Sequence, residues 1–254
     1  MSAWSLVARH RDIARADPLV FGRPRVPGVL SYSAHDTTAE AESWTVTPLG
    51  AVTLTVDLVT PNRVGLPPSA IIGPRDRPLT ATQSGRAVGV TIALSPPAAH
   101  ALLGPLHRFT GTAVGLSEAL TTHLAEQLAD LRTWPERFAL LDRYLARRLA
   151  TGPRPRPETL HAWRRLTETR GTLRIEALAT ELGWSRQHLV TRFRHEFGLA
   201  PKATAKVLRL HHAVRLMPAT DLATVAAVSG YADQAHLNRD FRTLTGTTPT
   251  DYLP

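Results

Sequence analysis

The chain has 254 residues, of which 43% are hydrophobic and 20% charged, as in a folded globular protein rather than a disordered one. It contains no cysteine, which excludes disulfides, zinc–thiolate sites and cysteine nucleophiles. The formal net charge of +9 favours a polyanionic partner. The N-terminus lacks the pattern of a signal peptide and no apolar run is long enough to span a membrane, so we expect a cytoplasmic, nucleoid-associated protein and no membrane partner.

The positive charge is concentrated in the C-terminal half. Residues 1–129 have a net charge of +1, whereas residues 130–156 and residues 158–254 each have +4. Apart from Lys202 and Lys206, all the basic residues are arginines. Arginine is suited to bidentate recognition of phosphate and guanine, although an arginine-rich genome would give the same bias.

The N-terminal part has the sequence period of β-strands, after 28 residues that prolines interrupt. In residues 51–59 and 87–94, branched apolar residues alternate with smaller or polar ones, which predicts half-buried strands. Residues 80–89, rich in threonine and glycine, are predicted to form turns. Shorter strands are predicted at 29–34, 43–47 and 69–72. These strands indicate a small β-rich domain, either a barrel or a sandwich.

Helical periodicity begins after Pro97, and two helices are predicted to flank the β-rich domain. Thr133 and Glu136 have capping-box spacing with Pro135 in the first turn, which predicts a helix from 135 to 150. The helix before it, 116–131, has a stripe of leucines that suits either a homodimer seam or packing against the strands. The stripe consists of Leu116, Leu120, Leu124, Leu128 and Leu131.

Residues 151–157 contain three prolines and are predicted to form a stiff, extended linker. We therefore divide the chain into a β-rich effector or dimerisation domain at 1–150 and an all-α domain at 158–254. Helices are predicted at 158–169, 173–182, 186–197, 201–217, 222–229, 234–245 and 249–252.

The C-terminal domain contains one small helical unit twice, with an offset of 47 residues before an internal turn and 48 after it. Each unit consists of a helix, a tight turn with glycine and a second helix, which is the helix-turn-helix pattern. Ser185, Asp221 and Asp233 are the predicted N-caps, and Gly198 and Gly246 the glycines that end helices. The fold class is therefore α+β, with two helix-turn-helix units joined by a long helix.

The second helix of each unit has one apolar face and one polar face. Leu189, Phe193 and Phe197 are predicted to anchor the first of these helices, and Leu237, Phe241 and Leu244 the second. The opposite faces carry arginine, which can bond guanine in bidentate fashion, and glutamine, which can do the same for adenine. This pattern predicts recognition helices that present base-reading side chains to DNA.

Two motifs resemble the DNA-binding domain of the AraC/XylS family of bacterial transcription regulators. They are Leu178-Ala179-x-x-Leu182-Gly183-x-Ser185-x-x-His188-Leu189-x-x-x-Phe193 and Ala226-x-x-Ser229-Gly230-Tyr231-x-Asp233-Gln234-x-His236-Leu237-x-x-x-Phe241. The closing Gly246-x-x-Pro249-x-x-Tyr252 is similar to the family's C-terminal signature. The resemblance covers the last third of the chain and implies recognition helices that enter successive major-groove turns on one face of DNA.

The resemblance also implies roles for individual residues. The base-reading set would be Arg186, Gln187, Val190, Thr191, Arg194, Gln234, Ala235, His236 and Arg239. Val190 and Ala235 offer only methyl contacts. The set that touches phosphate, and positions the protein without choosing sequence, would be Ser185, His188, Arg192, Lys202, Asn238 and Arg242, with Lys206 near it.

The remaining histidines give no pattern of catalysis or metal binding. His35, His100, His107 and His123 lack the paired spacing of a metal-binding cupin, and without cysteine the acceptor chemistry of alkylation-repair regulators is impossible. His188 and His236 are expected to touch DNA or support the family scaffold, and His211-His212 to lie on a solvated face. We expect no metal, no cofactor, no catalytic residue and no enzymatic activity.

The leading hypothesis is a sequence-specific transcription regulator whose N-terminal domain responds to a small-molecule effector. The alternative is a constitutive or dimerisation-controlled regulator without a ligand, and an enzyme in the N-terminal half is a third hypothesis that lacks a catalytic constellation. The expected partner is double-stranded DNA, and the candidate partners are a small-molecule effector, RNA polymerase and a second copy of the chain.

Overall fold

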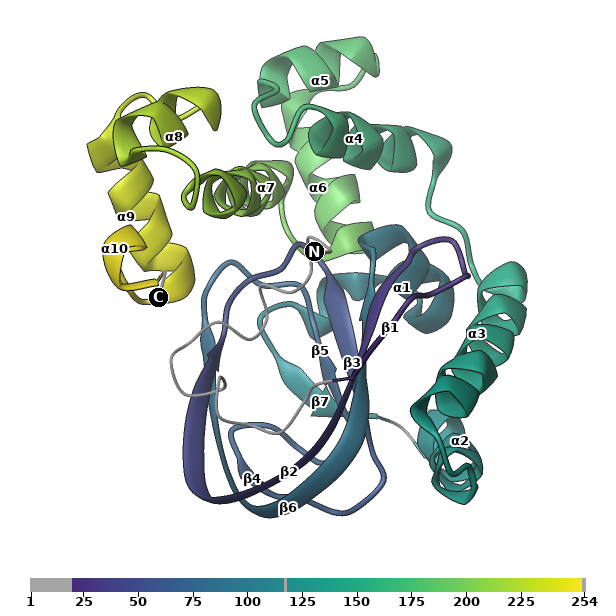
Figure 1. Ribbon diagram of the computed structural model, residues 1–254. Helices are drawn as coiled ribbons and strands as arrows, with labels where there is room; N and C mark the ends of the chain where they lie inside the picture. Colours follow the sequence, from purple (N-terminus) through teal and green to yellow (C-terminus); the bar gives the residue numbers. More distant parts are fainter. Residues whose placement is uncertain (1–19, 117, 253–254) are drawn as a thin grey trace.

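The computed structural model describes residues 20–116 and 118–252 (Figure 1). It confirms the α+β fold class, because a β-sheet occupies the N-terminal part and the C-terminal part is helical. The strands are β1 Val20–Gly22, β2 Val29–Val46, β3 Val52–Asp57, β4 Asn62–Val64, β5 Ala70–Ile72, β6 Leu79–Leu94 and β7 Ala113–Gly115. They form one antiparallel sheet in the order β1-β2-β6-β3-β5-β7, with β4 paired to β6.

The centre of the sheet is a pair of long strands, β2 and β6, and β2 was predicted as two separate strands. Strand β2 joins the predicted strands 29–34 and 43–47, and it pairs with β6 from Val29 to Val46. The prediction of turns at 80–89 is wrong, since these residues belong to β6. Glycine is needed there for close packing: a Cβ at Gly89 would lie 2.7 Å from the carbonyl oxygen of Val56.

Between residues 20 and 151, leaving out residue 117, the structure has three α-helices where the sequence predicted two. They are α1 Pro96–Leu103, α2 Glu118–Asp130 and α3 Trp134–Thr151, with a short 3-10 helix η3 at Leu106–Phe109. The capping box of α3 is confirmed, because Thr133 and Glu136 bond each other's backbone N–H. The extended linker is shorter than predicted, at 152–156, because Pro157 begins the next helix, where its missing N–H costs nothing.

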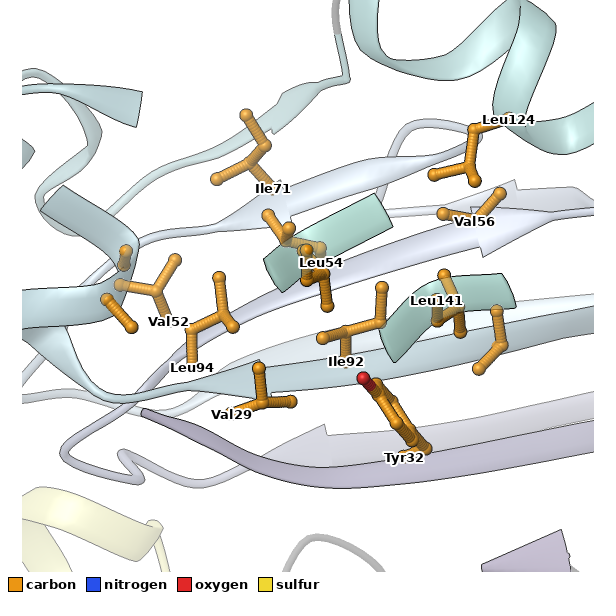
Figure 2. Close-up of a cluster of buried hydrophobic side chains, with 14 of the residues drawn as sticks. Val29, Tyr32, Val52, Leu54, Val56, Ile71, Ile92, Leu94, Leu124 and Leu141 are labelled. Atoms are coloured by element: carbon orange, nitrogen blue, oxygen red, sulfur yellow. The ribbon is translucent and has the colours of Figure 1, made fainter. Parts of the chain in front are cut away.

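The core of the N-terminal part lies between one face of the sheet and helices α1, α2 and α3 (Figure 2). Val52, Leu54 and Val56 from β3 point into it together with alternate residues of β6. Leu124 and Leu128 of α2 are buried in this core, so these members of the leucine stripe pack against their own sheet. The side chain of Leu120 lies outside the described part of the chain.

The C-terminal helices follow the predicted order closely. They are α4 Pro157–Glu168, α5 Ile175–Glu181, α6 Arg186–Phe197, α7 Pro201–Leu216, α8 Leu222–Val228, α9 Gln234–Thr245 and α10 Pro249–Tyr252. The predicted N-caps are confirmed, since the side chains of Ser185, Asp221 and Asp233 accept backbone N–H groups of α6, α8 and α9. Helix α7 lies between the two helix-turn-helix units (Figure 1). Among the described residues, none of the helices has the length and hydropathy needed to cross a membrane.

Candidate nucleic-acid interface

Helix α6 is held in place by its apolar face. Leu189, Phe193 and Phe197 are buried, and the rings of the two phenylalanines meet edge to face with centroids 5.0 Å apart. They pack against α4 and α5, where Leu166 and Leu178 are fully buried. The predicted anchors of the first recognition helix are thus confirmed, and its orientation in the domain is fixed.

Helix α9 is anchored in the same way against α7 and α10. Leu237, Phe241 and Leu244 have no exposed surface, and the ring of Phe241 meets that of Tyr252 edge to face at 5.1 Å. The two recognition helices therefore share an N-cap, an apolar anchor and a terminal glycine with positive φ, at Gly198 and Gly246.

Most of the residues expected to face DNA are exposed. From the base-reading set these are Arg186, Gln187, Thr191, Arg194, Gln234, Ala235 and Arg239, while Val190 and His236 are partly buried. From the phosphate set Ser185, His188, Arg192, Lys202 and Arg242 are exposed, while Asn238 is partly buried. Arg186 forms an exposed ion pair with Glu176 at 3.0 Å, a contact that solvent weakens and that DNA could displace.

Both histidines of the repeat pack against the aromatic ring of their own turn. The ring of His188 meets Trp184 edge to face at 4.6 Å, and the ring of His236 meets Tyr231 at 5.2 Å. His236 is held further: its Nδ1 lies 3.4 Å from the backbone N–H of Ala232, which donates to it. These contacts support a scaffold role for both histidines, and contact of the two rings with DNA, the other alternative from the sequence, stays a prediction.

The structure bears on two expectations about helix α7. Lys206, expected near phosphate, forms an ion pair at 3.1 Å with Asp240 of α9 and its side chain is only 26% exposed. The prediction of a solvated face at His211-His212 is wrong. His212 is buried, the ring of His211 bonds the carbonyl oxygen of Pro48, and burial lowers the pKa of both.

The C-terminal ends of both recognition helices lie against the N-terminal part. A Cβ at Gly198 would be 2.8 Å from Pro74, and one at Gly246 would be 3.7 Å from Pro78, so the loop between β5 and β6 contacts the equivalent glycine of each helix. Thr110 donates to the carbonyl oxygen of Gly198 at 3.1 Å. The N-terminal halves of α6 and α9, which carry Gln187 and Gln234, are therefore the halves left open.

Near the end of α6, two further contacts join this helix to the preceding parts of the chain. The rings of His107 and His195 stack with centroids 4.4 Å apart, and His107 Nδ1 lies 3.1 Å from the carbonyl oxygen of His195. Glu196 is buried and accepts the backbone N–H of Arg156 in the linker. No sequence signal marks these contacts, since they join residues that are 40 to 88 positions apart.

Within residues 20–116 and 118–252, no three histidine or acidic side chains gather in a group that could hold a metal ion. The exposed chemistry of α6 and α9 consists of amide, hydroxyl, methyl, imidazole and guanidinium groups. This combination can bond base edges and phosphates.

Comparison with known proteins gives two kinds of match. Residues 178–254 match the family described as "Helix-turn-helix domain". Among solved structures, the chain is similar to unsaturated fatty acid bound wild-type ToxT from Vibrio cholerae strain SCE256, with 9% identity, a TM-score of 0.51 and coverage of 91% of this chain and 96% of that one. At this identity the likeness shows a shared fold of both parts.

Two further similar structures have TM-scores below 0.5. ToxT from Vibrio cholerae O395 has 10% identity, a TM-score of 0.47 and coverage of 87% of this chain and 95% of that one. The C-terminal domain of AraT, a response regulator from Geobacillus stearothermophilus, has 21% identity and a TM-score of 0.37, and it covers 39% of this chain and 86% of its own. The comparison with curated proteins gives no match.

Proposed function

We propose that residues 178–254, which match a helix-turn-helix domain, are a DNA-binding domain of the AraC type, and that α6 and α9 read two successive major-groove segments of one duplex. The observation that supports this best is that α6 and α9 are packed in the same way. In each helix the leucine and phenylalanine side chains are buried, and the polar residues of the N-terminal half are exposed. Two such helices on one rigid domain suit a sequence-specific transcription regulator.

We assign the base contacts of α6 to Gln187 and Thr191, with methyl contact from Val190 and flanking contacts from Arg186 and Arg194. In α9 the equivalent contacts are assigned to Gln234, Ala235 and Arg239. His236 is given a smaller part, because its ring packs on Tyr231, its Nδ1 accepts the backbone N–H of Ala232 and its Nε2 lies 3.7 Å from Asp240 Oδ2. The exposed cations Arg192, Lys202 and Arg242 are assigned to phosphates.

Replacing Arg239 by alanine is expected to cost about 1–3 kcal/mol of binding at one base pair, because a bidentate contact to guanine is lost there. The probe is a duplex that the full chain selects from a random-sequence pool, with each base pair then varied in turn at constant salt. Arg143→Ala is the matched control, since Arg143 is exposed on α3 in the N-terminal part. An Arg239→Ala protein with unchanged affinity and base preference would remove this residue from the reading set.

For the effector, we propose a site between the sheet and the helix-turn-helix domain rather than inside the sheet. A cavity of about 190 Å³ lies there. Its lining is apolar at Leu30, Trp163 and Leu208, and positively charged at Arg170 and Arg215. Apolar walls with two cations fit an apolar carboxylic acid, which is the class of ligand in the ToxT structure of similar fold. Since typical ligand pockets measure roughly 300–1,000 Å³, we expect a small acid.

A series of aliphatic and aromatic carboxylic acids of increasing size should raise the melting temperature, with the smaller members most effective. The matched pair of variants is Arg215→Gln, which removes one cation of the cavity, and Arg143→Gln, which does not touch it. Stabilisation should be lost in the first variant only. If no acid stabilises the chain or changes its affinity for DNA, the alternative of a ligand-free, constitutive or dimerisation-controlled regulator holds.

A further inference from the structure

We infer that Arg209 of the connecting helix α7 fixes the relative orientation of the two helix-turn-helix units, with Asp240 as its partner in the second unit. The inference rests on the proposed function, in which both units engage one duplex. Arg209 and Asp240 are therefore positioning residues. Neither is in the base-reading set, and both determine the orientation of α6 and α9 relative to each other.

Arg209 contacts the loop between α4 and α5, which leads directly into the first unit. Its Nη1 donates to the carbonyl oxygen of Gly171 at 3.1 Å. This loop lies directly on α7, because a Cβ at Gly171, which has φ of +77°, would overlap the carbonyl oxygen of Ala205. The hydrogen bond thus joins a side chain of α7 to a loop whose backbone is already in contact with that of α7.

Arg209 binds the second unit through its turn and its recognition helix. The guanidinium carbon lies 5.4 Å from the ring centroid of Tyr231, over the ring, and Nη2 lies 3.8 Å from Asp240 Oδ2. Lys206, one turn earlier on α7, contacts the other carboxylate oxygen at 3.1 Å. The side chains of Arg209 and Asp240 are 19% and 14% exposed, so solvent screens this pair less than a surface ion pair.

The two units also meet beside Arg209. A Cβ at Gly230, in the turn of the second unit, would lie 2.6 Å from Thr172 in the loop of the first and 3.7 Å from Arg209 Cδ. One planar guanidinium therefore touches a carbonyl, an aromatic ring and a carboxylate at the point where the units adjoin. Lysine, with a single compact cation, cannot make these three contacts together.

A fixed orientation matters for affinity. Once one recognition helix has bound its segment of the duplex, binding of the other helix to the second segment is an intramolecular step. Its effective concentration is greatest when the spacing of the two helices already matches the groove, and it falls when the units must first be ordered. Arg209 thus raises affinity for a duplex with both segments, without reading a base itself.

The orientation is measured without DNA by spin labels on the full chain. Because the chain has no cysteine, Ala177→Cys in α5 and Ala227→Cys in α8 give two unique, exposed labelling sites. We expect a narrow distance distribution in the labelled parent and a broadened or shifted one in Arg209→Ala and Asp240→Asn. Arg164→Ala, an exposed arginine of α4, is the matched control and should keep the parent distribution.

An unchanged distribution in Arg209→Ala would overturn the inference and assign the orientation to the β5–β6 loop, which touches both units. Should Arg209→Ala fail to fold, Arg209→Lys and Asp240→Asn provide the same test with smaller changes. The parent distribution in both of them would overturn the inference equally.

A DNA measurement separates this inference from the proposed function. The probe is the duplex selected by the parent, intact or with one segment scrambled. Arg209→Lys and Asp240→Asn should bind the intact duplex on the order of tenfold more weakly and the scrambled duplex with parent affinity. Equal losses on both duplexes would contradict a positioning role. If the parent binds the intact and the scrambled duplex with equal affinity, the proposed function fails. The distances between the spin labels then still test whether Arg209 fixes the orientation of the two units.

Discussion

Phe241→Ala is expected to lower the free energy of unfolding by about 3–5 kcal/mol, because it removes a fully buried ring and leaves a cavity between α9, α7 and α10. This loss is a large fraction of the roughly 5–15 kcal/mol that stabilises most folded proteins. Since Phe241 anchors the second recognition helix, affinity for the selected duplex should fall with it. Urea denaturation of the full chain and binding to the duplex at constant salt measure the two effects.

Phe21→Ala is the matched control for this substitution. The side chain of Phe21, on β1, is 55% exposed, so its removal should change stability by less than about 0.5 kcal/mol. A comparable small loss in Phe241→Ala would mean that α9 is not anchored by its apolar face.

Gly171→Ala, in the loop before the first helix-turn-helix unit, should be more damaging than Gly183→Ala, in the turn of that unit. Gly171 and Gly183 both have positive φ, at +77° and +66°, so alanine at either position carries backbone strain of about 1–3 kcal/mol. At Gly171 the added Cβ also overlaps the Ala205 carbonyl, and such overpacking typically costs about 1–3 kcal/mol more. At Gly183 the position is open, with nothing within 4 Å.

The difference between the two variants isolates the contact of the α4–α5 loop with α7. Urea denaturation measures the difference in unfolding free energy between the two variants. The same pair of spin labels measures the change in the spacing of the two units. Equal stability of Gly171→Ala and Gly183→Ala would show that the loop does not lie on α7, and would remove the first contact of Arg209.

The recognition helices were predictable from the sequence because their signals are local. The structure places α6 at Arg186–Phe197 and α9 at Gln234–Thr245, the predicted limits. In each, an N-cap side chain bonds the N–H three residues later and a glycine with positive φ ends the helix. The apolar spacing between these signals also predicted the anchors, since a helix can bury only one stripe against its domain.

The sheet was predicted in part, for a physical reason. The predicted strands 51–59 and 69–72 contain β3 and β5, and 87–94 is the end of β6. Strands β1, β4 and β7 have three residues each and are too short to show a period. The prediction of turns at 80–89 failed because pairing with β2 keeps those threonines and glycines extended. Helix α1 was missed because it has only eight residues, two of them proline.

Contacts between distant residues could not be derived from local patterns. His211 was expected in solvent, yet it bonds Pro48, which is 163 positions away. Lys206 was expected near phosphate, yet its partner is Asp240 on another helix. The same holds for the contacts of Arg209 with Gly171, Tyr231 and Asp240, which depend on how the two copies of the unit pack rather than on the sequence of either.

Footprinting of the full chain on its selected duplex tests most directly whether α6 and α9 read one duplex together. We predict two protected major-groove segments on the same face, with centres about one helical turn apart, and loss of one segment only when the residues of one helix are replaced. A single protected segment, or two segments on opposite faces of the duplex, would contradict reading by both helices.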